Sequence, residues 1–160
     1  MERFVSSYTN RIDAKGRVSV PAPFRAILAR DGFDGVFCYP SLDQDTLDAG
    51  GASLIAEIQN LLEDLPPYSD ERDELSLALF GDSEILKIDQ DGRVVLPERL
   101  RSHAGIADRV CFVGVGHKFQ LWSPDKLEER RKTARARVRT HRNLLRARGA
   151  SAETPGSTGS

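Results

Sequence analysis

The chain has 160 residues, of which 29% are charged and 39% are hydrophobic, and its formal net charge is −1. Such a length allows one domain or two half-domains around a modest core. The longest apolar runs, such as Val110–Val113, are too short to cross a bilayer, and no signal-peptide core follows Met1. The sequence therefore predicts a soluble globular protein of the cytoplasm, without a membrane partner.

Residues 7–50 are expected to form a first unit. It begins with two short strands joined by a tight turn at Asp13–Arg17. A short helix should follow from Pro23 to Arg30, because proline fits the first helical turn, where its missing N–H would have no partner anyway. A further strand is expected at Val36–Tyr39, and the proline that follows should end it.

Residues 51–82 are expected to form a helical connector between two units. Its apolar residues recur at helical spacing, so that one face carries Leu54, Ile55, Ile58, Leu61, Leu62 and Leu65. The pair Pro66-Pro67 should end this helix, and a second helix is expected over Asp70–Phe80, with Ser69 or Asp70 as its N-cap. The apolar face either covers the core or meets a neighbouring subunit, and the sequence does not choose between the two.

Residues 83–126 are expected to form a second unit that repeats the first. The segments Ile12–Arg25 and Ile88–Arg101 agree at seven of fourteen positions at a constant offset of 76. An internal repeat of this kind decides the fold and indicates a pseudo-symmetric, barrel-like arrangement. Strands are expected at Ile85–Ile88, Val94–Leu96, Arg109–Val113 and Phe119–Trp122. The last of these strands also resembles Phe37–Ser41 of the first unit.

The C-terminal part should be a basic helix followed by a tail. Ser123 and Pro124 are a typical helix opening, with serine as the cap and proline at the first helical position. The helix is expected to run to about Arg148, with residues 127–148 forming its basic part. Its apolar line is thin and consists of Leu127, Ala134, Val138 and Leu145. Residues 149–160 have the composition of a disordered tail.

The small net charge conceals strongly segregated blocks. Residues 1–30 carry a net charge of +4, residues 31–86 carry −13, residues 87–124 carry +2 and residues 125–148 carry +7. This asymmetry predicts a surface facing a polyanion on the repeat-bearing parts, with a separate acidic connector. The acidic block taken alone is better explained by solvated surface helices.

Cysteine and histidine usage indicates neither a disulfide framework nor a metal site. Cys38 and Cys111 each lie in an apolar, strand-like run, which favours two buried free thiols. The histidines show neither zinc-finger nor helix-pair spacing with them; they are His103, His117 and His141. No metal and no other cofactor is expected.

The repeated turn has the pattern Asp-x-x-Gly-Arg, at Asp13–Arg17 and again at Asp89–Arg93. Glycine tolerates the positive φ of a tight turn, and aspartate can accept hydrogen bonds from turn amides. The arginine carries a planar fork that suits phosphate or the O6 and N7 atoms of guanine. A purely structural role is the alternative, in which Asp and Arg pair with each other or across the repeats.

The neighbours of each arginine bear on this choice. Arg3, Arg11 and Lys15 surround Arg17 in sequence and favour a DNA contact there. For Arg93, whose turn contains an additional acid, the structural and the DNA-binding interpretations have equal weight.

The doubled motif, each copy followed by an apolar pair and proline, resembles the MraZ family of bacterial transcriptional regulators, and each half resembles a SpoVT/AbrB-type domain. The resemblance covers roughly residues 1–127; the Arg-rich helix and polar tail are less typical. It implies an α+β fold, a pseudo-symmetric swapped-hairpin (AbrB-like) β-barrel built from two internal repeats, with connecting helices and a C-terminal helix.

The same resemblance implies a repressor-like, nucleoid-associated regulator of the division and cell-wall gene cluster, including its own promoter. Its partners would be double-stranded DNA with G-rich direct repeats and further copies of itself, in a ring-shaped homo-oligomer larger than a dimer. The residues expected to form the DNA-binding site are Arg11, Asp13, Lys15, Arg17, Asp89 and Arg93.

Catalysis has little support in the sequence. It contains no nucleophile elbow, phosphate loop or zinc-protease pattern, and the Gly-x-Gly at Gly114 and Gly116 fits a turn between strands. We therefore expect a binding protein rather than an enzyme, without a small-molecule substrate. One alternative is an AbrB-like protein-interaction or antitoxin-type module, which usually has one such motif per chain. Another is an enzyme on a related double-psi barrel, which would need polar residues converging in a cleft.

Overall fold

The computed structural model describes residues 3–153, with side chains described as far as Arg146. One compact unit extends to Lys126, and the residues from Leu127 onward form a second unit. Helices and antiparallel strands occur together in the first unit, which confirms the α+β class. Among the described residues, no helix is both long and apolar enough to span a membrane.

The first repeat contributes β1 (Ser7–Arg11), β2 (Arg17–Ser19), α1 (Ala22–Arg30), β3 (Gly35–Pro40) and β4 (Leu47–Gly50). Helix α1 begins after a proline and buries Phe24 and Leu28, which lie one turn apart on the same face. Its end is closed by the Phe33 N–H, which donates to the Leu28 carbonyl at 3.0 Å across a glycine with φ of +76°.

The second repeat contributes β5 (Glu84–Lys87), β6 (Arg93–Val95), α4 (Glu98–Ala104), β7 (Arg109–Gly114) and β8 (Phe119–Trp122). Helix α4 ends at Gly105, whose left-handed conformation lets the Ile106 N–H donate to the Arg101 carbonyl at 2.9 Å. The two repeat helices therefore begin after prolines and end at glycines in the same way.

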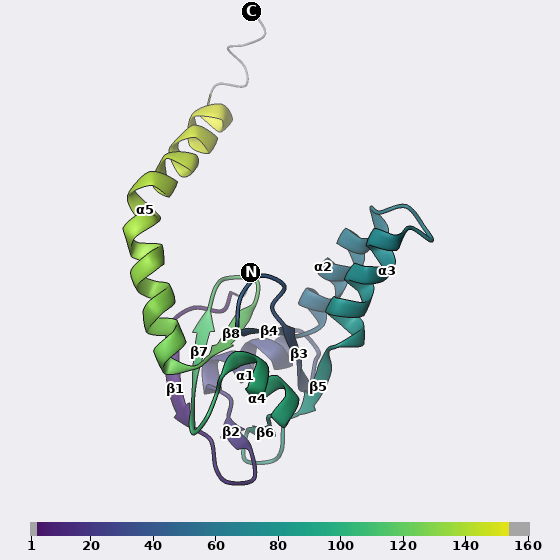
Figure 1. Ribbon diagram of the computed structural model, residues 1–160, viewed down its shortest axis with the longest axis vertical. Helices are drawn as coiled ribbons and strands as arrows, with labels where there is room; N and C mark the ends of the chain where they lie inside the picture. The colour runs from purple at the N-terminus through teal and green to yellow at the C-terminus, as the bar shows by residue number, and fades with distance from the viewer. Residues whose placement is uncertain (1–2, 154–160) are drawn as a thin grey trace, which may run out of the picture. The chain divides into compact units, whose positions relative to one another are not determined.

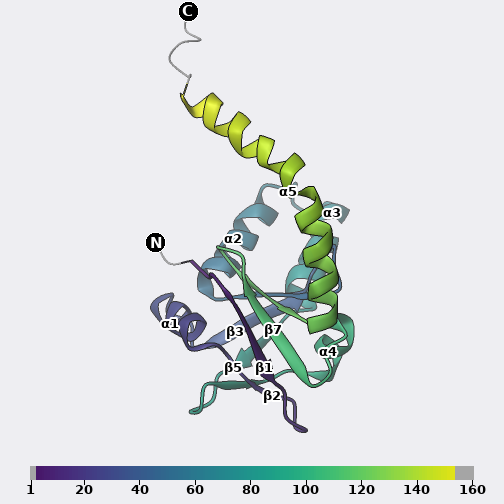
Figure 2. The ribbon, with the colours of Figure 1, turned by 90° about the vertical axis from the view of Figure 1, so that its left-hand side faces the viewer.

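The strands pair across the repeats. The six-stranded sheet has the order β1-β7-β8-β4-β3-β5, and β2 pairs with β6 in a separate two-stranded sheet. Each strand of the first repeat thus has an antiparallel partner from the second: β1 with β7, β2 with β6, β3 with β5 and β4 with β8 (Figure 1, Figure 2). Exchanging equivalent strands reproduces the same order, so the repeats are related by a pseudo-twofold axis.

The pairing does not close a barrel. Strands β1 and β5 remain the two edges of the six-stranded sheet, and no ladder within residues 3–153 joins them. The short strands β2 and β6 bond to each other instead of extending either edge. The described residues therefore form an open sheet with a two-stranded ribbon, and the expected AbrB-like barrel is not confirmed among them.

An aromatic cluster forms the centre of the larger core. The Phe24 side chain is 0% exposed, and its ring centroid lies 5.3 Å from that of Phe4, 5.5 Å from that of Tyr8 and 4.9 Å from that of Phe119. The contacts with Phe4 and Tyr8 are edge-on, and such contacts add to the free energy gained by burying the rings. Residues from both repeats meet here, so neither repeat has a complete core of its own.

A smaller core lies between the sheet and the connector, which forms α2 (Ala52–Glu63), α3 (Asp70–Ser76) and the π-helical turn η1 (Leu77–Gly81). The members of this cluster that are buried are Phe37, Tyr39, Leu54, Ile58 and Leu62. Leu61 is 63% exposed, so the predicted apolar face is mainly core with an exposed flank. Ser69 is the N-cap of α3, and its Oγ accepts the Arg72 N–H at 3.2 Å.

Strand β4 was not predicted, and the predicted match between Phe37–Ser41 and Phe119–Ser123 is wrong. Phe37 lies in β3, whose counterpart is β7, whereas β8 corresponds to β4. The sequence of Leu47–Gly50 lacks the pattern of a strand because it contains an acid, Asp48, at a position that is buried in the structure. That carboxylate accepts hydrogen bonds from the Lys118 and Gln120 side chains, each at 2.9 Å.

Both cysteines are free and buried, as predicted. Burial raises the pKa of the Cys38 thiol well above its ordinary value, with the nearby Asp48 carboxylate adding to the effect. The Cys111 Sγ lies 3.2 Å from the Thr9 Oγ1. Cys38 is therefore an inert core side chain rather than a reactive thiolate.

Helix α5 spans Pro124–Glu153 and opens with the Ser123 Oγ accepting the Lys126 N–H at 3.5 Å. The helix continues beyond its expected end at Arg148, so residues 149–153 of the expected tail are helical. The rest of that tail, residues 154–160, lies outside the described residues.

Replacing Phe24 by alanine should destabilise the fold strongly. The loss of a fully buried ring at the meeting point of both repeats should lower the free energy of unfolding by about 3–5 kcal/mol. Denaturant unfolding followed by circular dichroism measures this. Leu42→Ala, in a loop where the side chain is 52% exposed, is the control and should change it by about 0.5 kcal/mol or less. Equal effects of both substitutions would contradict the assigned core.

Candidate nucleic-acid interface

The first turn is organised by the Asp13 carboxylate. Its Oδ1 accepts the backbone N–H groups of Lys15 and Arg17, each at 2.9 Å. The Gly16 N–H donates to the Asp13 carbonyl at 3.0 Å, and Gly16 has a φ of +82°. Aspartate and glycine therefore have the architectural roles that the motif predicts.

The same carboxylate orients the arginine. The Arg17 Nε donates to the Asp13 Oδ2 at 2.7 Å, and the Arg17 side chain is 35% exposed. Within the described residues, the two Nη atoms of Arg17 have no hydrogen-bond partner. The guanidinium is thus fixed at one edge and keeps its outer donors for an external acceptor, so that structural and binding roles are compatible in this residue.

Hydrogen bonding lowers the pKa of Asp13. The backbone N–H of Arg17 is the largest cause, burial opposes it, and the Arg17 side chain then lowers the pKa further. Asp89 in the second turn has a lowered pKa for the same reason, led by the backbone N–H of Arg93. Both carboxylates are therefore ionised at neutral pH.

The second turn has the same backbone but a different charge. The Asp89 Oδ1 accepts the N–H groups of Asp91 and Arg93 at 2.8 and 3.0 Å. The Arg93 Nη2 lies 3.2 Å from the Asp91 Oδ2, and its Nε lies 3.5 Å from the Asp89 Oδ2. Position 91 corresponds to Lys15 in the first turn. Arg93 therefore faces two carboxylates, whereas Arg17 faces one and has a lysine beside it.

The pairing of β2 with β6 brings both turns to one end of the compact unit. The Val20 N–H donates to the Gly92 carbonyl at 3.0 Å, and the Leu96 N–H donates to the Gly16 carbonyl at 2.8 Å. Figure 1 and Figure 2 both show the two loops emerging beside β2, away from α2. Five of the six predicted site residues belong to these two turns.

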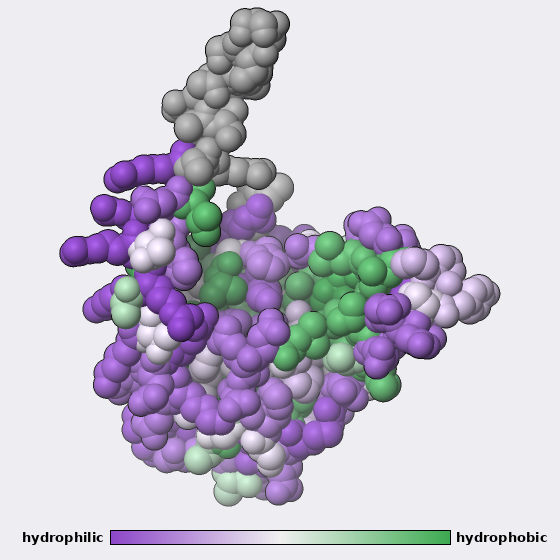
Figure 3. All heavy atoms as spheres, turned by 45° about the horizontal axis from the view of Figure 1, so that its top comes forward, coloured by the Kyte–Doolittle hydropathy of each residue, from purple (hydrophilic) through white to green (hydrophobic). Residues whose placement is uncertain are grey.

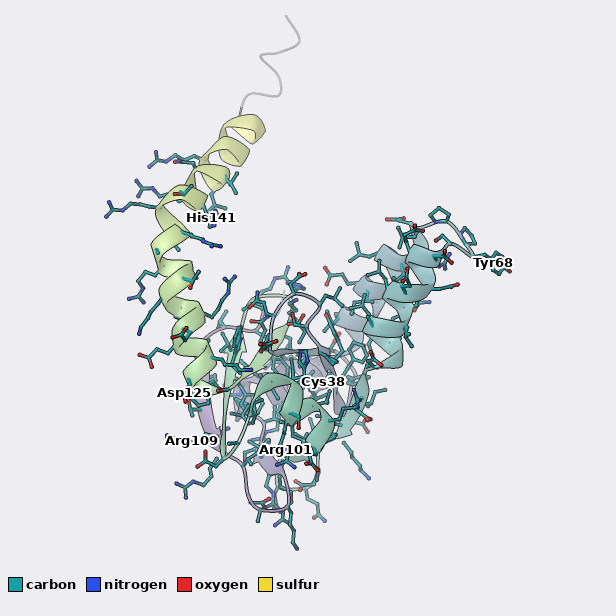
Figure 4. The ribbon with its side chains drawn as sticks, in the orientation of Figure 1. Cys38, Tyr68, Arg101, Arg109, Asp125 and His141 are labelled. Carbon is teal, nitrogen blue, oxygen red and sulfur yellow. The ribbon has the colours of Figure 1, made fainter. Side chains whose placement is uncertain are left out.

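The remaining predicted residue, Arg11, is exposed at the end of β1 and is paired in register with Arg109 of β7, which is also exposed. Arg109, which is labelled in Figure 4, was not predicted as a site residue. The repeat comparison could not have found it, because it lies outside the fourteen matched positions. It adds a positive charge beside Arg11.

Two further arginines near the turns were not predicted as site residues. Arg25 of α1 and Arg101 of α4 occupy equivalent positions in the repeats, and Arg101 lies on the part of α4 next to the turns (Figure 4). Both positions are arginine in the repeat comparison, and this match was the feature of the sequence that could have revealed them. Metal ligation has no candidate here, since no group of three or more His, Cys, Asp or Glu in the described part of the chain is placed to hold an ion.

Two interleaved repeats, each presenting an Asp-led turn that contains an arginine, define a class of duplicated α+β proteins. Residues 79–146 match the family model described as "MraZ protein, putative antitoxin-like". The chain is 56% identical over 158 residues to the transcriptional regulator MraZ of Xanthobacter autotrophicus, with 99% of each chain covered.

Two other relatives bear the same name. That of Methylocella silvestris is 56% identical over 155 residues, with 97% of this chain and 94% of the relative covered. That of Rickettsia akari is 43% identical over 146 residues, with 91% and 98% covered. The chain belongs to the MraZ family of transcriptional regulators.

Replacing Asp13 by asparagine should remove a contribution to stability that depends on pH. The lowered pKa of Asp13 means that the ionised carboxylate stabilises the folded state above about pH 4, and this contribution disappears as pH falls through the lowered pKa. Denaturant unfolding at several pH values should show a gap between wild type and Asp13→Asn at neutral pH that narrows in acid. The control is Asp34→Asn, which removes an exposed carboxylate and should leave no such gap. A gap that is constant with pH would contradict the role of the charge.

Proposed function

We propose that this chain binds double-stranded DNA through its two turns and thereby acts as a repressor-like regulator of transcription. The observation that carries the proposal is the Arg17 guanidinium, which is fixed by Asp13 at 2.7 Å and keeps its Nη donors unpaired within the described residues. Membership of the MraZ family supports it. Following the family resemblance, the proposed targets are G-rich direct repeats upstream of the division and cell-wall gene cluster, including its own promoter.

Arg17 is proposed as the residue that reads bases. A guanidinium can donate two parallel hydrogen bonds to O6 and N7 of guanine, and a side chain that is already oriented loses less entropy on binding. Arg11 and Lys15 are exposed close by and suit phosphate contacts, which position the protein without specifying sequence. Asp13 supports this site by orienting Arg17 rather than by touching DNA.

The second turn is proposed as the weaker contact. Asp91 and Asp89 both lie close to the Arg93 guanidinium and would have to share it with DNA phosphates that they repel. The first turn has no acid at the equivalent position and carries Lys15 there instead. Duplication has therefore left two turns of the same shape with different affinities for a polyanion.

The basic helix is proposed to add phosphate contacts. Residues 125–148 carry a net charge of +7, and the side chains from Glu128 to Arg146 are exposed apart from the partly buried Ala134. Contacts of this kind strengthen binding to every sequence and make it sensitive to salt. They would also favour a location on the nucleoid.

Several copies are proposed to act together, in a ring-shaped homo-oligomer larger than a dimer. One turn presents few side chains, so a single copy offers little contact with DNA. An exposed apolar surface lies over the connector, where Leu61 of α2 is 63% and Leu77 of η1 is 64% exposed (Figure 3), and it is the proposed contact between copies. The crossed pairing of strands further supports a swapped-hairpin relation of the AbrB type between the repeats.

Arg17→Ala should weaken specific DNA binding more than Arg93→Ala. Loss of a bidentate contact to guanine costs roughly 1–3 kcal/mol of discrimination, whereas Arg93 is already compensated by two acids. Fluorescence anisotropy with labelled duplex from the region upstream of the gene measures both affinities, with circular dichroism as the control for folding. Equal losses would show that both turns read DNA alike.

The salt dependence separates this function from the protein-binding alternative. Binding to duplex should weaken steeply between low and physiological ionic strength, because basic side chains release counterions from phosphates. The antitoxin-like wording of the family description favours a protein partner as the second candidate. If wild type shows no shift with upstream DNA at low salt, that candidate replaces the proposed function.

The oligomer should recognise repeated sites cooperatively. Copies held at a fixed spacing make each later contact intramolecular, which can raise overall affinity by roughly 10²–10⁴. We expect sedimentation to give a species larger than a dimer, and affinity to rise from one to three direct repeats spaced about 10–10.5 bp apart. A sedimenting monomer, or equal affinity for one, two and three repeats, would refute the assembly.

A further inference from the structure

Arg25 and Arg101, which are equivalent in the two repeats, each lie against the turn of the opposite repeat. A Cβ placed on Gly92 would be 2.7 Å from the Arg25 Cζ and 2.8 Å from its Nε and Nη1. A Cβ placed on Gly16 would be 3.9 Å from the Arg101 Cζ. The guanidinium of Arg25 therefore occupies the space that a side chain at position 92 would need.

The crossing follows from the pairing of β2 with β6. Because the two strands are antiparallel, the end of β2 meets the start of β6, and the Val20 N–H donates to the Gly92 carbonyl at 3.0 Å. The helix that follows β2 thus begins beside the second turn. The Arg25 Nε donates to the Val20 carbonyl at 3.0 Å, which holds the guanidinium against Gly92. The same geometry brings the start of α4 to the first turn.

The two arginines differ in how their donors are used. The Nε of Arg25 has a partner, whereas the Nε of Arg101 is buried and has no hydrogen-bond partner among the described residues. Arg101 also contacts its glycine less tightly. The first turn, which carries Arg17 and Lys15, therefore has a second guanidinium beside it whose Nε is unused, and the second turn has one whose Nε is bonded to the Val20 carbonyl.

We propose that these helix arginines are positioning residues for DNA binding that act across the repeats: Arg101 supports the turn that carries Arg17, and Arg25 supports the turn that carries Arg93. This inference rests on the proposed function. A guanidinium packed on a glycine limits movement of the turn and adds positive charge next to it. Both effects keep the turn arginine oriented toward phosphate or guanine.

The linear sequence would pair these residues differently. Arg25 lies eight positions after Arg17 in the same repeat, and Arg101 lies eight positions after Arg93. If each helix arginine served its own repeat, Arg17 would be coupled to Arg25. The contacts with Gly16 and Gly92 connect the opposite pairs, so the two assignments predict different energetic couplings.

Double-mutant cycles on DNA affinity decide between them. Single and double alanine variants are made for the pairs Arg17 with Arg101 and Arg25 with Arg93, and for the same-repeat pairs as matched controls. The Kd for upstream duplex is measured by anisotropy, and thermal unfolding confirms that each variant is folded. We expect the cross-repeat pairs to deviate from additivity by about threefold or more and the same-repeat pairs to be additive. Coupling within repeats, or in neither set, overturns the inference.

A second cycle tests the contact without DNA. Gly92→Ala forces a Cβ against the Arg25 guanidinium at a φ of +77°, so part of its effect on unfolding should disappear when Arg25 is also alanine. Gly16→Ala with Arg101→Ala is the control and should be closer to additive, because that contact is an ordinary one. If wild type fails to bind DNA, the proposed function fails and the positioning role fails with it. If DNA binds but Gly92→Ala costs the same in both backgrounds, only the cross-repeat inference fails.

Discussion

The antiparallel pairing of β2 with β6 is the interaction on which the rest of the structure depends. Each strand has only three residues, yet their ladder joins the two repeats and continues into both turns through the bonds of Val20 to Gly92 and Leu96 to Gly16. It sets both turns at one end of the unit and determines where α1 and α4 begin. The aromatic core around Phe24 then packs residues of both repeats together.

Symmetry of the backbone and asymmetry of charge have separate consequences. The two turns share the same hydrogen bonds from aspartate to backbone amides, which maintain their shape. Lysine at position 15 and aspartate at position 91 give them opposite charges at the exposed tip. A duplicated protein can in this way keep one scaffold while its two copies acquire different strengths of contact with a polyanion.

The connector stabilises the fold with one apolar face and leaves other apolar side chains exposed. Leu54, Ile58 and Leu62 fill the space over Phe37 and Tyr39, which accounts for most of the predicted apolar face. Other large apolar side chains of the connector, such as Leu61 and Leu77, remain exposed (Figure 3). The buried face alone completes the core, and the exposed one is the contact proposed between copies.

The sequence alone determined the duplication, the two turns, the free buried cysteines and most helix and strand positions to within a few residues. These features depend on local chemistry: glycine permits a positive φ, aspartate accepts nearby amides and proline opens a helix. Five of the six predicted site residues lie in these two turns for that reason. The sequence did not reveal β4, since its pattern is interrupted by the buried Asp48. It also gave the wrong counterpart for β8, because the offset between equivalent elements falls from 76 at α1 to 72 at β4.

Only the tertiary structure decided which strands pair, that the sheet stays open, and that Arg25 and Arg101 lie against the opposite turns. Backbone hydrogen bonds between strands are the same for any side chain, so local sequence does not specify a partner. That choice is made by long-range packing, in which residues distant in sequence share one core.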